Sequence, residues 1–183
     1  MELEMTKEEA LLNQIANKDQ LSMKEYLYVT DWAENASNFL VFGTGADTPY
    51  WKMIQPNVTF LEDHGEWLDK TDPKQIEVKY TTTRNQSDAL LSSYRAGVFT
   101  PLKIKLPKII KETQWDAIFV DGPQGYNDSR PGRMQSLFTA QQLASEHTNI
   151  FIHDINRRVE SAWADTLFTK TVTQFDRLRH VRI

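Results

Sequence analysis

Three residues that could do chemistry stand directly after two apolar runs in the second half of the chain. Asp121 follows the run Ala117–Val120, while His153 and Asp154 follow the run Asn149–Ile152. Two carboxylates and an imidazole could hold a divalent metal ion, because hard cations accept oxygen and imidazole ligands. One of the three could instead act as a general base on a hydroxyl group, histidine being the residue type that titrates closest to neutral pH. In the structural alternative, Asp154 caps the next helix and His153 is a hydrogen-bonded residue of the fold.

A second group of such residues lies in the first half of the chain. The stretch Gly43-Thr-Gly45-Ala-Asp47 follows the run Phe39–Phe42, and Glu62 ends the run from Val58, 19 residues after Gly43. An acidic side chain about 20 residues after such a glycine typically accepts hydrogen bonds from ribose hydroxyls. A dinucleotide-binding loop would have a glycine where this chain has Thr48. The pattern therefore favours a ligand with adenosine but no diphosphate, such as S-adenosylmethionine, and the alternative is an ordinary turn before a solvated carboxylate.

Arginines and a tyrosine flank the acidic residues. Arg133 follows the loop that contains Tyr126, and Arg157 and Arg158 follow Asp154. Guanidinium groups bind carboxylates and phosphates through paired hydrogen bonds, and a tyrosine ring can stack on a sugar or a base. We expect these four residues to bind an anionic substrate, unless the arginines are simply solvated.

Buried parallel strands are the elements that would position these residues. Continuous apolar runs of four or five residues are typical of strands that are covered on both faces, and ligands bind beyond the carboxyl ends of such strands. The expected strands are 39–42, 58–61, 76–80, 117–120 and 149–152.

Helix signals alternate with the expected strands, which predicts an α/β fold with helices on both faces of the sheet. Capping boxes begin at Thr6 and Ser22, and further helices are expected from Thr48, Ser87 and Pro131. The β-branched tail from residue 167 to residue 183 predicts an antiparallel hairpin. We expect one domain over residues 1–183, with N-terminal helices in 1–36 and the sheet in 37–183.

The composition excludes several classes of protein. The 183 residues contain no cysteine, which excludes disulfide scaffolds, cysteine-ligated metals and thiol nucleophiles. The net charge of −4 argues against a nucleic acid partner. The printed chain has no signal-like start and no long apolar window, so we expect no membrane contact and a cytoplasmic location, or the Golgi if the chain is part of a longer protein. The oligomeric state is left open.

Six blocks of the chain together resemble the polysaccharide-biosynthesis methyltransferase family, which includes glucuronoxylan 4-O-methyltransferases and irregular-xylem-fifteen-like proteins. The blocks are Phe39–Asp47, Phe60–Glu62, Leu90–Arg95, Trp115–Tyr126, Pro131–Met134 and His153–Glu160. The resemblance implies a class I S-adenosylmethionine-dependent methyltransferase with a Rossmann-like fold, O-methylation of glucuronic acid on a polysaccharide, and an effect of divalent metal. The chain departs from the plant pattern in having no cysteines and a shorter stretch between Tyr94 and Trp115. These differences argue against xylan as the substrate more than they argue against methyl transfer.

The residues and the resemblance together define the expected site. We expect Asp121, His153 and Asp154 to be catalytic and to be the ligands of any divalent cation. The residues expected to contact S-adenosylmethionine are Gly43, Gly45, Asp47, Glu62 and Asp121. The expected acceptor is a hydroxyl of an acidic, glucuronic-acid-type saccharide. Two alternatives remain: another small anionic hydroxyl compound as acceptor, or a non-catalytic relative that binds a saccharide or a partner protein.

Overall fold

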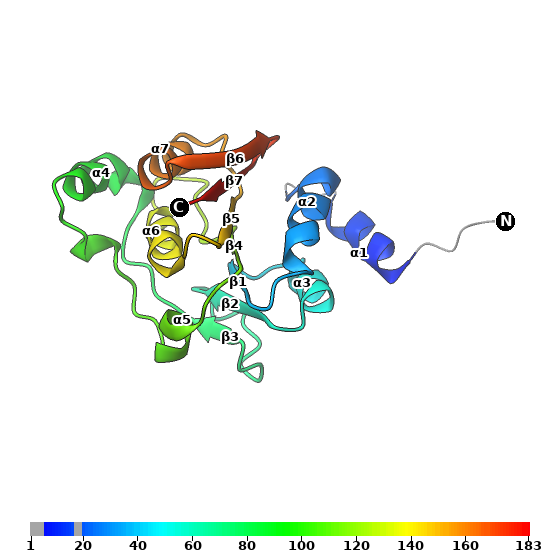
Figure 1. The fold of residues 1–183 in the computed structure, drawn as a ribbon. Coiled ribbons are helices and arrows are strands. Elements are labelled where there is room, and N and C mark those ends of the chain that lie inside the picture. Colours follow the sequence, from blue (N-terminus) through cyan, green and yellow to red (C-terminus); the bar gives the residue numbers. More distant parts are fainter. Residues whose placement is uncertain (1–5, 17–19) are drawn as a thin grey trace.

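A seven-stranded sheet runs through the computed structural model, which describes residues 6–16 and 20–183 (Figure 1). The strand order is β3-β2-β1-β4-β5-β7-β6; β1 to β5 are parallel, and β7 pairs antiparallel with both β5 and β6. The strands are β1 (Phe39–Phe42), β2 (Val58–Glu62), β3 (Gln75–Glu77), β4 (Ala117–Val120), β5 (Asn149–Ile152), β6 (Lys170–Phe175) and β7 (Leu178–Arg182). The prediction of a mostly parallel sheet with a C-terminal antiparallel hairpin is confirmed.

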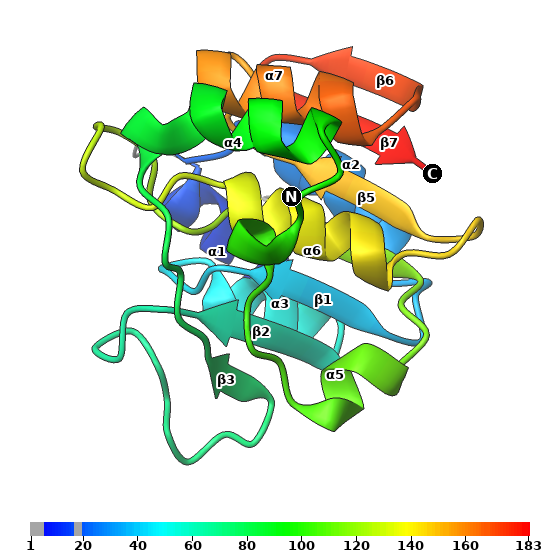
Figure 2. The same ribbon diagram turned by 90° about the vertical axis from the view of Figure 1, so that its left-hand side faces the viewer.

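Helices cover both faces of the sheet, as expected for the class I methyltransferase fold (Figures 1 and 2). One face carries α1 (Lys7–Ile15), α2 (Met23–Ala33) and α3 (Thr48–Ile54). The other carries α4 (Ser87–Arg95), α5 (Lys108–Glu112), α6 (Met134–Leu143) and α7 (Arg158–Leu167). No helix in the described part of the chain is both long and apolar enough to cross a bilayer. Of the region 1–36 expected to hold N-terminal helices, residues 1–5 and 17–19 lie outside the described residues.

Each buried strand contributes side chains to two separate cores, because successive side chains point to opposite faces. In β1, Leu40 and Phe42 pack with α4, α6 and α7, whereas Phe39 and Val41 pack with the side of α1, α2 and α3. All four side chains are buried. This double burial explains why the strands appear in the sequence as continuous apolar runs.

Helices α3 and α4 begin at Thr48 and Ser87, as predicted, while their N-cap residues and the ends of β3 and α6 differ from the predicted ones. Helix α3 has Asp47 as its N-cap residue, and the hydroxyl of Thr48 accepts a hydrogen bond from the N–H of Gly45. The N-cap residue of α4 is Gln86, and the buried hydroxyl of Ser87 accepts the Nε1–H of Trp163. Strand β3 is shorter than predicted, since the chain leaves the sheet after Val78. Helix α6 begins three residues after Pro131, the position that was predicted to open it.

Glu25 joins α2 to the turn of the C-terminal hairpin. Its Oε2 accepts the N–H of Ser22 at 2.6 Å, which completes a capping box, and its Oε1 accepts the N–H of Arg177 at 2.7 Å. Glu25 is fully buried. One carboxylate therefore satisfies two backbone groups that lie far apart in the sequence.

We expect Glu25→Ala to lower the free energy of unfolding by about 2 kcal/mol, because a buried N–H without a partner costs about 1–3 kcal/mol. The matched control is Glu9→Ala, which removes the exposed capping box of α1 and no tertiary contact, and should cost less than about 1 kcal/mol. Urea unfolding followed by circular dichroism measures both changes. Equal losses in the two variants would contradict the joining role of Glu25.

Candidate functional site

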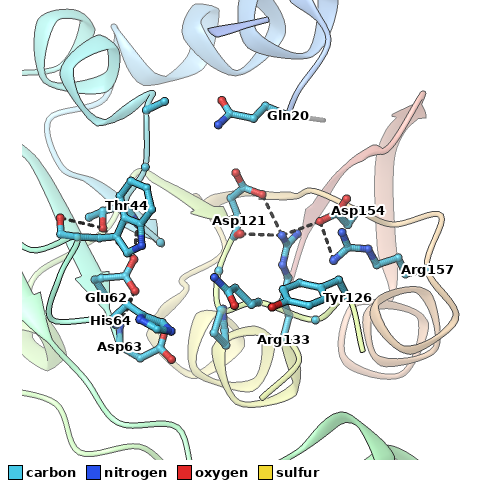
Figure 3. Close-up of a pocket in the computed structure, with 18 residues that line it drawn as sticks. Gln20, Thr44, Glu62, Asp63, His64, Asp121, Tyr126, Arg133, Asp154 and Arg157 are labelled. Carbon is cyan, nitrogen blue, oxygen red and sulfur yellow. Dashed lines mark hydrogen bonds and ion pairs between the residues drawn. The ribbon is translucent and has the colours of Figure 1, made fainter. Parts of the chain in front are cut away.

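A pocket of about 320 Å³ opens at the carboxyl ends of the parallel strands (Figure 3). Its walls are the loops that follow β1, β2, β4 and β5, so residues from distant parts of the sequence face one another. In Figure 3, Thr44, Glu62, Asp63 and His64 form one side, and Asp121, Tyr126, Arg133, Asp154 and Arg157 form the other. This is the position at which ligands bind in open parallel sheets.

Two glycines cross at the base of this pocket. Gly43 has a φ of 108°, which favours glycine, and its N–H donates to the C=O of Leu61 at 2.9 Å. A Cβ atom added to Gly122 would lie only 2.8 Å from the Cα of Gly43. The loops after β1 and β4 therefore touch through their backbones, and a ligand could approach the main chain closely. Gly43 and Gly45 both line the pocket.

Glu62 ties the loops after β1 and β2 together. Its Oε2 accepts the N–H of Thr44 at 2.7 Å and the hydroxyl of Thr44 at 2.8 Å. Its Oε1 accepts the N–H groups of Asp63 at 2.8 Å and His64 at 2.7 Å. The carboxylate lines the pocket but is only 6% exposed. Its four acceptor positions are thus used within the protein, and a ribose hydroxyl would have to replace one of these donors.

Three pocket residues were missed in the sequence analysis, although they follow β2 directly. Asp63, His64 and Trp67 line the pocket beside Glu62, and Trp67 is 57% exposed. Burial and then the neighbouring Glu62 carboxylate raise the pKa of Asp63 to about 6. The rule that selected Asp121 and His153, namely polar residues just beyond a strand, would also have selected Asp63 and His64.

Asp47 lies behind the glycine loop and not among the residues that line the pocket. Its Oδ2 accepts the Nε1–H of Trp51 at 2.9 Å and the hydroxyl of Tyr26 at 3.4 Å. Burial and then the charge of Asp121 raise the pKa of Asp47 to about 6. The structure therefore places Asp47 in the packing of α2 against α3, outside the lining of the pocket.

Asp121 presents one free oxygen to the pocket. Its Oδ1 lies 2.7 Å from the Nδ1 of His153 and accepts the Nη2–H of Arg133 at 3.0 Å. Its Oδ2 has no hydrogen-bond partner among the described residues, and the side chain is 26% exposed. Burial alone would raise the pKa of Asp121, but His153 and Arg133 together hold it below the ordinary value. Asp121 is therefore an ionised, oriented carboxylate at neutral pH.

Asp154 lies deeper in the same wall, where β5 ends. Its φ of 58° is unusual for a residue with a side chain, and such strain often occurs at functional sites. The carboxylate is paired with Arg133 at 2.7 Å and Arg157 at 3.0 Å. It does not cap α7, whose N-cap residue is Arg157, so this part of the structural alternative is wrong, whereas His153 is indeed a buried, hydrogen-bonded residue.

Arg133 holds the ends of β4 and β5 together. Its Nη2 donates to the C=O of Asp121 at 2.6 Å as well as to both carboxylates, and its Nη1 donates to the C=O of His153 at 2.6 Å. The residue is only 4% exposed. Its hydrogen-bonding groups are thus largely used by the protein, which makes Arg133 a positioning residue of the wall and leaves little of it for a substrate.

The cluster of Asp121, His153 and Asp154 has the residue types of a divalent metal site, and its candidate ligand atoms lie within 4.8 Å of one another. The guanidinium of Arg133 already lies between the two carboxylates, and Arg157 also pairs with Asp154. His153 points its Nδ1 at Asp121 and does not line the pocket. In this arrangement the negative charge is compensated and the donor set does not fit a divalent cation.

The other expected substrate residues fall on two different surfaces. Tyr126 and Arg157 line the pocket; Tyr126 is 56% exposed, with the guanidinium of Arg130 5.0 Å from its ring centre. Arg158 lies outside the pocket, where its exposed side chain pairs with Asp88 at 3.2 Å. The segment 81–95 contributes no residue to the pocket.

Comparison with known proteins gives one family. Residues 24–181 match the family model described as IRX15/IRX15L/GXM. Arabinogalactan O-methyltransferase 2 of Arabidopsis thaliana is 34% identical over 175 residues, which cover 80% of this chain and 60% of that protein. Glucuronoxylan 4-O-methyltransferase 2 of the same plant is 35% identical over 171 residues, covering 80% of this chain and 59% of the relative.

Protein IRREGULAR XYLEM 15 of Arabidopsis thaliana is also similar, with 32% identity over 155 residues that cover 70% of this chain and 48% of the relative. The chain thus spans about 60% of the length of the two methyltransferases named above. The family match covers most of the chain, including every strand of the parallel sheet and all pocket residues except Gln20. The chain belongs to the IRX15/IRX15L/GXM family.

Proposed function

We propose that this chain carries the catalytic domain of an S-adenosylmethionine-dependent O-methyltransferase whose acceptor is a hydroxyl of an acidic saccharide. The observation that carries the proposal is the free Oδ2 of Asp121, which faces a glycine-floored pocket at the carboxyl ends of the strands. The similarity to polysaccharide O-methyltransferases supports it. We also propose that residues 1–183 form a single domain.

The cofactor side of the pocket, in this proposal, is the side of Glu62. S-adenosylmethionine would supply a methyl group on a positively charged sulfur: when a hydroxyl oxygen attacks the methyl carbon, the carbon–sulfur bond breaks and S-adenosylhomocysteine leaves. The pocket volume lies at the lower end of the range for small-molecule sites, and the close glycine crossing leaves room for a ligand along the backbone. Glu62 fixes the loop that carries Thr44, and Asp63 and Trp67 offer a carboxyl group and a ring face. The residues present therefore fit the cofactor.

The acceptor side is the side of Asp121. A sugar hydroxyl is a weak nucleophile at neutral pH, so its proton must pass to a base as the oxygen attacks. In the proposed mechanism the Oδ2 of Asp121 accepts this proton, while Arg133 and His153 hold the Oδ1 in place. Asp154 orients Arg133 and Arg157 and does not contact the acceptor. His153 acts through Asp121, because its side chain is only 3% exposed.

In this proposal, Arg157 and Tyr126 give the acceptor side a preference for acidic sugars. Arg157 is 30% exposed beside the pocket, so part of its guanidinium can pair with the carboxylate of an acidic sugar. The exposed ring of Tyr126 can lie against a sugar face. The proposed acceptor is therefore a uronic-acid-type residue of a polysaccharide.

Glu62→Gln tests the cofactor side. We expect the affinity for S-adenosylhomocysteine to fall about tenfold or more, because the loop of Thr44 loses a carboxylate acceptor and charged hydrogen bonds are worth about 1.5–3 kcal/mol. Calorimetry on both proteins measures the change. Glu66→Gln, which alters an exposed carboxylate in the next loop, is the control and should bind as the wild type does. An absence of binding to the wild type would overturn the cofactor assignment.

Asp121→Asn tests the base. The substitution keeps the size of the side chain and removes its basicity, so we expect kcat for methyl transfer to fall about 10²–10⁴-fold. Binding of S-adenosylhomocysteine should change little. Asp128→Asn, in the exposed part of the same loop, should leave kcat unchanged. If the wild type binds S-adenosylhomocysteine but methylates neither acidic saccharides nor small anionic hydroxyl compounds, the protein is a non-catalytic relative.

Arg157→Gln tests the preference for an acidic acceptor. We expect KM for a glucuronic-acid-containing acceptor to rise about tenfold, with a smaller effect on kcat, because an interaction present both before and in the transition state is lost. Arg158→Gln removes the same charge at the adjacent residue outside the pocket and should have no such effect. Equal effects of the two substitutions would show that general charge, and not contact with the acceptor, sets KM.

A further inference from the structure

A second hollow lies on the sheet face that carries α6, away from the pocket just described. It is lined by Glu77, Val78, Lys79, Thr81, Lys103, Ile104 and Lys105, and we call it the lysine groove. Its volume of about 600 Å³ exceeds that of the pocket, and the two hollows share no lining residue. Its lining residues come from the chain that leaves β3 and from the chain that leads down to α5, and both segments can be followed in Figure 2.

The side chain of Gln135 holds the two walls at a fixed separation. Its Oε1 accepts the N–H of Thr81 at 2.8 Å on one wall, and its Nε2 donates to the C=O of Pro101 at 3.0 Å at the start of the other. Gln135 is fully buried. The buried amide of Gln135 therefore fixes the two walls of the groove relative to each other.

The three lysines of the groove form no ion pair within the part of the chain that the structure describes. Lys79, Lys103 and Lys105 are all exposed. Glu77 is the one carboxylate of the lining. The chain as a whole carries a net charge of −4, whereas the lining of this groove carries a net positive charge. An anionic ligand would supply the missing charge.

The backbone of the groove is also available to a ligand. Val78 donates its N–H to Glu62 of β2, and β3 is the last strand on this side of the sheet, so the alternate groups of Glu77 face outward. On the opposite wall, the N–H and C=O groups of Ile104 and Lys105 have no partner among the described residues. Ile104, which is only partly buried, adds apolar surface between these polar groups.

We infer that the lysine groove binds a stretch of an acidic polysaccharide outside the reaction pocket. Carboxylates along the saccharide would pair with the three lysines, and its hydroxyl groups would bond to the free backbone groups of the two walls. The inference rests on the proposed function only for the saccharide nature of the ligand. It gives the protein a second contact with a polymeric acceptor, which a single sugar residue in the pocket could not provide.

The test measures binding of oligogalacturonate to the full chain at low and moderate salt. We expect binding that weakens with salt, and an affinity about tenfold lower in the triple variant Lys79→Gln, Lys103→Gln, Lys105→Gln, within the range for three exposed ion pairs. The matched control is Lys7→Gln, Lys70→Gln, Lys170→Gln, which removes the same charge from exposed lysines elsewhere. Equal affinities of the two triple variants would overturn the inference.

A steric variant separates the groove from a general positive charge. Thr81→Trp leaves every lysine in place and fills part of the groove, so we expect it to weaken oligogalacturonate binding as well. Poly-L-glutamate of equal charge should bind more weakly than oligogalacturonate to the wild type. Tighter binding of poly-L-glutamate would overturn the saccharide assignment in favour of an acidic peptide.

Measuring the binding of S-adenosylhomocysteine distinguishes a failure of the groove proposal from a failure of the proposed function. The lysine triple variant should bind S-adenosylhomocysteine like the wild type, because the groove and the pocket share no residue. Lysine-dependent binding of oligogalacturonate without any binding of S-adenosylhomocysteine would uphold the groove and overturn the proposed function. The reverse pattern would uphold the methyltransferase and overturn the groove.

Discussion

The pocket depends on the ion pairs and hydrogen bonds that the buried guanidinium of Arg133 makes. The guanidinium joins the carboxylates of Asp121 and Asp154 and two carbonyl groups at the ends of β4 and β5. A buried charge is tolerated only when it is paired, so each of the three residues requires the other two. The network therefore places one carboxylate oxygen of Asp121 toward the pocket and keeps the remaining oxygens in the wall. A base produced in this way is oriented before any substrate arrives.

The opposite wall is built by a different means, namely close approach of backbones. Gly43 and Gly122 pass so near to each other that side chains are excluded, and Glu62 then fastens the adjoining loops through four hydrogen bonds. One wall thus relies on charge pairing and the other on glycine and a single carboxylate. Both depend on the parallel register of β1 with β2 and β4, which brings the strand ends to one edge.

The buried strands and the location of the site can be predicted from the sequence. The runs at 39–42, 117–120 and 149–152 form strands with the predicted bounds, because residues buried on both faces leave a clear pattern. The hydrogen-bond and ion-pair partners of the charged residues cannot be predicted in this way. Arg133 reads as a loop arginine available to a substrate, and only the fold shows that its partners lie 12 to 21 residues away. Asp47 likewise reads as part of a ligand loop, although it is buried against Trp51.

The distribution of charge fits the chemistry that we propose. A cationic methyl donor would lie beside Glu62 and Asp63, while an anionic acceptor would meet Arg157 on the other side, so each reactant finds opposite charge. The two walls are held by separate hydrogen-bond networks that meet where Gly43 crosses Gly122, so the donor side and the acceptor side are held at a fixed separation. Methyl transfer requires the attacking oxygen, the methyl carbon and the sulfur to be aligned, and orientation of this kind can supply a large share of the rate enhancement. The rigidity of the paired Arg133 network is therefore as important to the proposed reaction as the basicity of Asp121.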